Sequence, residues 1–262
     1  MLPTITKEFL EKEAIKVAEF AEVNLKKTEG HLEKHNDILD YYFGVIRRQS
    51  ILLNELALIL IHSKTQNITP LFIICRCLCD DFINMFYLKL NDNEEENIIR
   101  INANASYEDF KSLNILTQSN EKHFKGEYPY YMSAKQLADF KKGYIADKNH
   151  QQYFVNIENF EFKKYMQLRQ VAEKIEDFEL SKLSPRAYYL WSYFSSFIHY
   201  SAKTLISEMY NANEQLHLFM IEETILYSFN TTELAFRYFT EKYGIKLTED
   251  EQLFKRYMIK YE

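Results

Sequence analysis

Two apolar stretches of this chain each carry a pair of polar side chains spaced four residues apart. Arg76 and Asp80 stand in "TPLFIICRCLCDDFINMFYL". Ser195 and His199 stand in "AYYLWSYFSSFIHYSA". Residues four apart share one face of a helix, and an unpaired buried charge costs on the order of several kcal/mol. We therefore expect the guanidinium, the carboxylate, the hydroxyl and the imidazole to meet in one polar site between two helices.

These side chains could cleave RNA without a metal ion. The reaction needs a base for the 2′-hydroxyl proton, an acid for the leaving oxygen and a cation for the phosphate. His199 and Arg76 could fill two of these roles, and Asp80 would orient one of them. Two serine hydroxyls of the second stretch could donate hydrogen bonds to the phosphate, and the indole could line the same space. The catalytic candidates are Arg76, His199, Asp80 and Ser195, and the ligand-binding candidates are Ser201 and Trp191.

The same side chains could instead hold two helices in register without any catalysis. A buried ion pair beside a Ser-His hydrogen bond specifies how helices pack. A catalytic or binding site must be reachable from solvent, whereas a structural lock is sealed. At this stage both interpretations stay open: an enzyme, or a non-catalytic helical interaction module.

A metal-dependent hydrolase is a third alternative. Helical bundles build di-metal sites from two Glu-x-x-His motifs and partner glutamates, and that signature is absent from the sequence. The acids and imidazoles that remain for such a site are Asp80, Asp81, His199, His217, Glu222 and Glu223. The cysteines at positions 75, 77 and 79 lie within five residues of each other, with no second cluster to complete a zinc set, and are predicted to be reduced core residues. We therefore expect no metal and no cofactor.

The elements around these residues are predicted to be helices. Only 5 Gly and 4 Pro occur in 262 residues, too few for turn-rich β folds or glycine-rich phosphate loops. Apolar spacing predicts helices over about 4–27, 32–63, 94–116 and 213–243, the last ending at Gly244. Further helix starts are indicated by a cap at Thr4, by Thr69 with Pro70, by Ser184 with Pro185 and by a capping box from Thr248 to Glu251. The fold class is therefore all-α: a single helical bundle over 1–262.

The middle of the chain has a weaker pattern. Residues 117–155 contain Gly126, Pro129 and several aromatic residues, and are predicted to form an irregular surface insertion within the one domain. Lysines and aromatic residues interleave there. They could stack on single-stranded nucleic acid, or form a solvated face that covers the core.

Composition and charge restrict the partners. The net charge of -6 argues against non-specific coating of nucleic acid, although a local basic groove can coexist with it. No signal peptide opens the chain and no run of about 18 apolar residues occurs, so we expect a cytoplasmic protein with no membrane partner. A homodimer is predicted through the 213–243 helix, on the apolar side chains Phe219, Leu226, Leu234, Phe236 and Phe239.

The motifs resemble those of a known group of proteins. Arg76-x-x-x-Asp80 followed much later by Ser195-x-x-x-His199-x-Ser201 is similar to a bacterial all-helical group with an Arg-x-x-x-Glu helix and a Ser-x-x-x-His-x-Ser helix. That group is similar to HEPN-like domains, including abortive-infection proteins. The resemblance implies a HEPN-like hairpin core with extra helices, a role in phage defence or as a toxin, and RNA or a protein as partner. HEPN ribonucleases carry Arg and His on one helix, whereas Arg76 and His199 fall on two.

Overall fold

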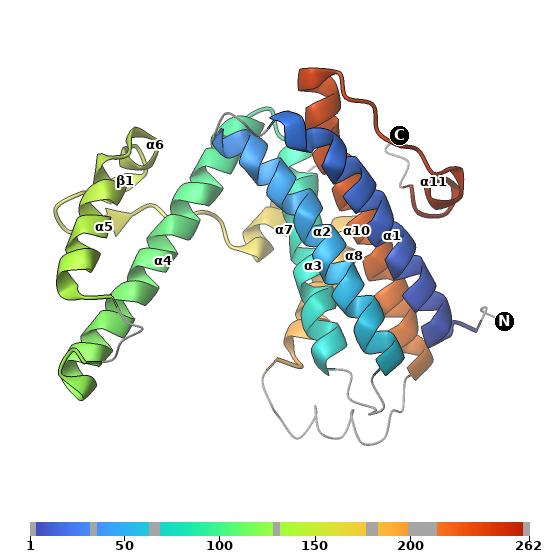
Figure 1. Ribbon diagram of the computed structural model, residues 1–262, viewed down its shortest axis with the longest axis horizontal. Coiled ribbons are helices and arrows are strands. Elements are labelled where there is room, and N and C mark those ends of the chain that lie inside the picture. Colours follow the sequence, from blue (N-terminus) through green and yellow to red (C-terminus); the bar gives the residue numbers. More distant parts are fainter. Residues whose placement is uncertain are drawn as a thin grey trace. The chain divides into compact units, whose positions relative to one another are not determined.

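The chain folds as an all-α protein, as predicted. The computed structural model describes residues 4–31, 36–62, 69–127, 132–176, 183–198 and 214–258. Within these ranges, the strands form only one two-stranded antiparallel sheet. The chain divides into two compact units. The bundle unit comprises Met1–Asp92 and Gln167–Glu262, and the inserted unit comprises Asn93–Met166; Figure 1 shows the helices of both.

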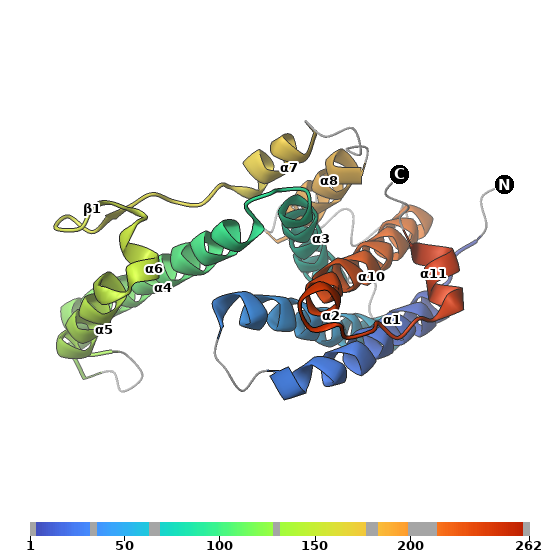
Figure 2. The same cartoon turned by 90° about the horizontal axis from the view of Figure 1, so that it is seen from above.

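The bundle unit is built around four long helices that lie side by side (Figures 1 and 2). These are α1 (Lys7–Thr28), α2 (Asp37–His62), α3 (Thr69–Lys89) and α10 (Glu214–Tyr243). The shorter α7 (Leu168–Glu176) and α8 (Leu183–Ser195) pack on α3, and a 3₁₀ turn, η1 (Glu29–His31), follows α1. Large side chains such as Tyr42, Phe72 and Phe236 are fully buried in the core. Since α2, α7, α8 and α10 all pack on α3, the packing of this unit positions the buried face of α3.

Helix ends agree only in part with the sequence prediction. The hydroxyl of Thr6, not of Thr4, caps α1 by accepting a hydrogen bond from the backbone N–H of Phe9. The last helix, α11 (Glu251–Tyr257), is capped by Asp250 rather than by Thr248. Gly244 ends α10 with φ +67°, as the prediction required. The two caps were misplaced by two residues because neighbouring side chains of the same capping type compete for one helix start.

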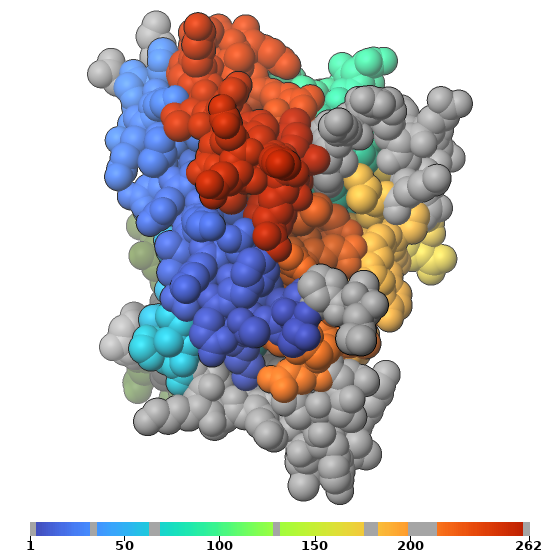
Figure 3. Space-filling view, turned by 90° about the vertical axis from the view of Figure 1, so that its right-hand side faces the viewer, coloured from blue at the N-terminus to red at the C-terminus, as the bar shows by residue number. Residues whose placement is uncertain are grey.

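The C-terminal residues fold back along the bundle. In Figure 3 they lie over α10 and against α1. The ring of Phe254 packs edge-on against Phe20 of α1 and Phe229 of α10. The hydroxyl of Tyr257 donates a 2.6 Å hydrogen bond to the buried carboxylate of Glu13. Aromatic packing and a charge-assisted hydrogen bond therefore join α11 to both helices.

The inserted unit contains α4 (Glu94–Phe124), α5 (Ala134–Ala146), α6 (Lys148–Gln151), β1 (Phe154–Asn156) and β2 (Glu161–Phe162). Its core comprises Ala103, Tyr144, Tyr153 and Phe162. The stretch 117–155, predicted to be irregular, is mostly helical here because α4 runs on to Phe124 and Ser133 begins α5 with a capping box. The single domain expected from the sequence stays a prediction.

The surface proposed for a homodimer is smaller than the sequence suggested. Leu234, Phe236 and Phe239 are buried inside the bundle unit, which leaves only Phe219 and Leu226 of the five apolar side chains partly exposed. Since α10 packs against α1, α2 and α3, most of its circumference is core. None of the described helices is both long enough and apolar enough to cross a membrane.

Candidate functional site

The structure brings together Arg76 of α3 and Ser195 of α8, which are 119 residues apart in sequence. The Nε of Arg76 donates a 2.9 Å hydrogen bond to the Ser195 Oγ. Ser195 donates its own hydrogen to the backbone carbonyl of Trp191, at 2.7 Å. Because a serine hydroxyl has a single hydrogen, Ser195 has none left for a phosphate in this conformation. Its contribution is to hold the guanidinium.

The guanidinium of Arg76 also lies over an aromatic face. Its Cζ is 5.0 Å from the ring centroid of Trp191, within the range of a cation–π contact. Tyr188 stacks on the same indole with ring centroids 5.6 Å apart. A hydrogen bond at Nε and a ring on one face together fix the plane of the guanidinium.

The two Nη groups of Arg76 are not used by this arrangement. Neither makes a hydrogen bond or an ion pair with any residue that the structure describes, and the side chain is only half-buried. An arginine fork presents paired N–H donors that match the oxygens of a carboxylate or a phosphate. The cluster therefore contains a half-buried, oriented guanidinium whose Nη groups are unused by described residues.

Asp80, one turn after Arg76, is directed to a different partner. Its Oδ1 accepts a 2.8 Å hydrogen bond from Asn84 Nδ2, and it forms no direct ion pair with Arg76. Burial raises the pKa of Asp80, and the positive charges of Arg76 and then Arg48 oppose that rise. The indole of Trp191 also favours the ionised form of Asp80. The Nε1 of Trp191 nevertheless has no hydrogen-bond partner among the described residues. Asp80 is therefore a carboxyl group that binds a proton more readily than a solvated one does.

Asp81, the next residue, lies in a polar chain that the sequence analysis did not predict. Its Oδ2 accepts from Gln49 Nε2 at 2.8 Å and pairs with Arg48 Nε at 2.9 Å, both on α2. Gln49 in turn accepts a 2.7 Å hydrogen bond from Ser228 of α10. Burial raises the pKa of Asp81 to about 7, with Arg48 opposing the rise. The chain therefore joins three helices and contains a carboxyl group that titrates near neutrality.

Two of the candidate residues lie outside the described residues, namely His199 and Ser201. The helix α8 ends at Ser195, and the next hydrogen bonds, Phe197 N to Phe194 O and Ile198 N to Ser195 O, span three residues. The structure thus places Arg76, Asp80, Ser195 and Trp191 in one cluster. The two remaining candidates are known here only by their spacing in sequence.

The residues considered for a metal site have other partners. His217 is buried, and its Nε2 lies 3.0 Å from the Tyr193 hydroxyl. Burial lowers the pKa of His217, which favours a neutral imidazole. Arg186 holds Glu223 in a bidentate pair at 2.9 to 3.0 Å, and Glu222 pairs with an arginine of α11. Within the described ranges, no three His, Cys, Asp or Glu side chains are arranged to hold a metal ion.

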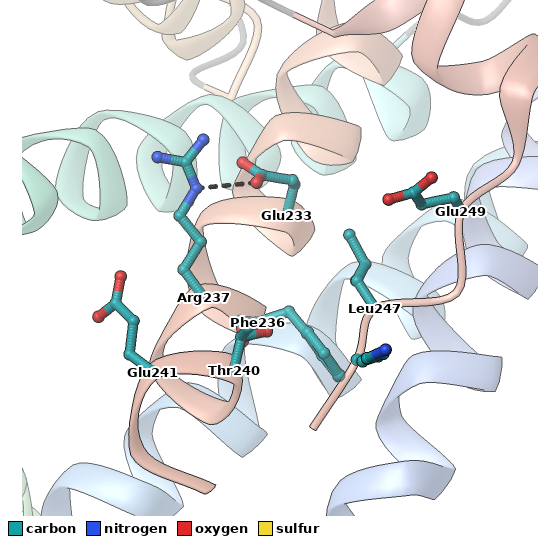
Figure 4. A pocket seen from close by; sticks show the side chains of 8 residues that line it. Glu233, Phe236, Arg237, Thr240, Glu241, Leu247 and Glu249 are labelled. Carbon is teal, nitrogen blue, oxygen red and sulfur yellow. Dashed lines mark hydrogen bonds and ion pairs between the residues drawn. The ribbon is translucent and has the colours of Figure 1, made fainter. Parts of the chain in front are cut away.

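A separate hollow of about 340 Å³ lies between α10 and the residues that precede α11 (Figure 4). Glu233 is buried and accepts a 2.8 Å hydrogen bond from Arg237 on the next turn. Two further acids, Glu241 and Glu249, line the hollow with Lys246. Three carboxylates against two cations make this hollow unfavourable for an anion.

No protein-family model, no curated protein and no solved structure matches this chain.

Proposed function

We propose that the α3–α8 cluster is the phosphate-binding site of a metal-independent endoribonuclease. The supporting observation is the orientation of Arg76: its Nε is bonded to Ser195, its plane lies on Trp191, and its two Nη groups are unused by described residues. A guanidinium that is fixed before the ligand arrives loses little rotamer freedom on binding. Arg76 would hold one phosphodiester of the RNA and stabilise the charge that develops on it.

The carboxyl groups beside Arg76 supply protons in this proposal. Burial raises the pKa of both Asp80 and Asp81, and that of Asp81 reaches about 7. A general acid works best when its pKa lies near the operating pH. We assign the acid role to Asp80, because the positive charge of Arg76 acts directly on the pKa of this carboxyl group. The base role is assigned to His199 on its sequence spacing from Ser195.

The resemblance to HEPN-like and abortive-infection proteins suggests the setting of this activity. A protein that cleaves cellular RNA would act as a toxin or in phage defence. We place it in the cytoplasm, because its RNA substrate is there, and we retain the homodimer as a prediction, now restricted to the exposed part of α10 that carries Phe219 and Leu226.

The test is cleavage of total cellular RNA by the purified protein in EDTA. Wild type is compared with Arg76→Ala, Arg76→Lys and His199→Ala, each checked for folding by its thermal unfolding curve. Arg47→Ala removes an exposed arginine from α2 and is the matched control. We expect wild type and the control to cleave RNA into discrete fragments. Arg76→Ala and His199→Ala should lose cleavage by a factor of about 100 or more, the usual scale for removing an acid–base group or a charge-stabilising donor.

Arg76→Lys separates charge from geometry. Lysine keeps the positive charge but lacks the planar fork. A site that binds phosphate through the two Nη groups of Arg76 would therefore lose most of its activity in this variant. Absence of RNA cleavage by the wild-type protein would overturn the proposed function. Full activity in a folded His199→Ala protein would remove the base role from that residue alone.

A structural lock is the second candidate, and the bond between Arg76 and Ser195 favours it. This bond joins α3 to α8, and Trp191 and the guanidinium pack in the same junction. In that case wild type cleaves nothing, and Arg76→Ala unfolds at markedly lower temperature than Arg47→Ala. The function would then be the binding of a protein partner by a rigid helical module.

A further inference from the structure

The inserted unit contains a groove of about 530 Å³ between α4 and α5. Its floor is aromatic, with the rings of Phe110 and Phe160 in contact at a centroid distance of 4.4 Å. Phe160, which lies in the turn between β1 and β2, lines the groove. The groove has the size of a small-ligand site.

Phe160 is held in a costly backbone conformation. Its φ is +53°, in the left-handed region that residues with a side chain rarely adopt. Its amide donates a 3.1 Å hydrogen bond to the carbonyl of Ile157, which closes the turn. The rings of Tyr107 and Phe154 pack around it, with centroids 5.5 and 5.2 Å away. Strain that is maintained by its surroundings points to a functional position, and here it directs a ring into the groove.

Positive charge is placed beside this floor. The Nζ of Lys141 lies 4.8 Å from the centroid of Phe160, and no described residue pairs with its charge. Lys111, which also lines the groove, pairs with Glu108 at 3.1 Å, and Lys164 pairs with the same carboxylate at 3.3 Å. Glu121 is the acid that lines the groove itself. Among the residues that line the groove, two lysines, Lys111 and Lys141, therefore face one carboxylate, an excess of one positive charge.

Side-chain amides complete the wall. Asn114 and Gln118 of α4 and Asn159 of the turn line the groove. Amides offer both donors and acceptors, which is what the edges of nucleobases require. An aromatic floor, a lysine above it and amides at its sides are complementary to a base with its phosphate.

We propose that this groove binds a nucleotide of single-stranded RNA. The base would replace Lys141 over the aromatic floor, its edge would face the amides, and the displaced ammonium of Lys141 would pair with the flanking phosphate. The choice of RNA over another planar anion rests on the proposed ribonuclease function. Stacking on an aromatic side chain and contact with a backbone phosphate are the two means by which proteins bind single strands.

The test is fluorescence anisotropy of the full-length protein with a labelled 2′-O-methyl oligouridine. This probe lacks the nucleophilic 2′-hydroxyl, so binding is measured without cleavage. Lys141→Gln is compared with Lys142→Gln, which removes the same charge from the next, exposed residue of α5. We expect the affinity of Lys141→Gln to fall about fivefold or more, and that of Lys142→Gln to stay within about twofold of wild type.

The salt dependence gives a second readout that altered folding would not imitate. For single strands, each phosphate contact contributes about 0.7 to the slope of log affinity against log salt. Lys141→Gln should lower that slope by about this amount, while Lys142→Gln leaves it unchanged. Equal affinities and slopes for the two variants would overturn the proposal, as would preferential binding of an acidic peptide over the oligonucleotide.

This experiment and the cleavage assay can fail independently. If Arg76→Ala abolishes RNA cleavage and Lys141→Gln leaves oligonucleotide binding intact, the proposed function stands and the groove is not its RNA-binding surface. If the wild-type protein cleaves nothing but Lys141→Gln weakens binding, the ribonuclease proposal fails and the groove remains a nucleotide site.

Discussion

Replacing Asp81 by Asn should change how the stability of the protein depends on pH. The carboxyl group is largely enclosed, with 16% of its side chain exposed, and burial raises its pKa from 3.8 to about 7. Below pH 3.8 the group is protonated in the folded and the unfolded protein alike. As pH rises to about 7, the unfolded chain ionises first, so the free energy of unfolding of the wild type falls over this interval.

The size of the fall follows from the two pKa values. Each pKa unit corresponds to about 1.4 kcal/mol, so raising the pKa from 3.8 to about 7 gives an upper value of about 4 kcal/mol. Arg48, the charged partner, is 51% exposed, and water at that end weakens the effect of burial. We therefore expect roughly half of the upper value, about 2 kcal/mol. Asparagine keeps an oxygen that can accept from Gln49 but cannot ionise, so the variant should not share this fall.

The assay is urea unfolding of wild type and Asp81→Asn at several pH values between about 4 and 8, which spans the titration. Asp92→Asn removes one exposed carboxylate from the same unit and is the control. The stability of Asp81→Asn relative to wild type should rise by about 2 kcal/mol from the lower to the higher pH. Parallel pH curves for wild type and Asp81→Asn, or a relative loss at high pH, would refute the reasoning.

Three further substitutions test other contacts. Tyr257→Phe removes the 2.6 Å hydrogen bond to the buried Glu13, and should cost about 1 to 3 kcal/mol in urea unfolding; no change would mean that other donors satisfy Glu13. Burial lowers the pKa of Lys89 to about 8, so wild-type stability should rise between pH 8 and 10.5, and Lys89→Gln should flatten that rise in thermal unfolding. Gly244→Ala, at φ +67°, should destabilise by about 1 kcal/mol, while Gly44→Ala inside α2 should stabilise by roughly 0.5 to 1 kcal/mol; equal effects would contradict the backbone argument.

Features that depend on local chemistry could be predicted from the sequence. The end of α10 at Gly244 follows from one residue's backbone freedom, and the start of α3 at Thr69 follows from a threonine before a proline. The hairpin of β1 and β2 could not be predicted, because strands this short are stabilised by the aromatic core of the inserted unit and not by their own periodicity.

Only part of the candidate site could be predicted from the sequence. Helical spacing in two apolar stretches correctly implied that Arg76 and Ser195 would meet. On an ideal helix Asp81 points about 100° away from Asp80, but spacing alone cannot show that α2 packs on that side. Arg48 and Gln49 were missed because an arginine and a glutamine on an amphipathic helix usually face solvent. Which polar residue becomes buried depends on the packing of helices that are distant in sequence.

The lock and the phosphate site use different atoms of the same side chain, so both can be true. Arg76 bonds Ser195 through Nε, whereas the Nη groups are unused by described residues. Ser195→Ala should therefore cost about 1 to 2 kcal/mol of stability, the lower range for a hydrogen bond to a charged group, yet leave a guanidinium on Trp191 that still binds phosphate. Arg76→Lys removes the bond and the fork together. If the residue is only a lock, the two variants lose similar stability and differ in nothing else. If it also binds phosphate, RNA cleavage falls far more in Arg76→Lys than in Ser195→Ala at equal stability, and this difference is the observation that separates the two roles.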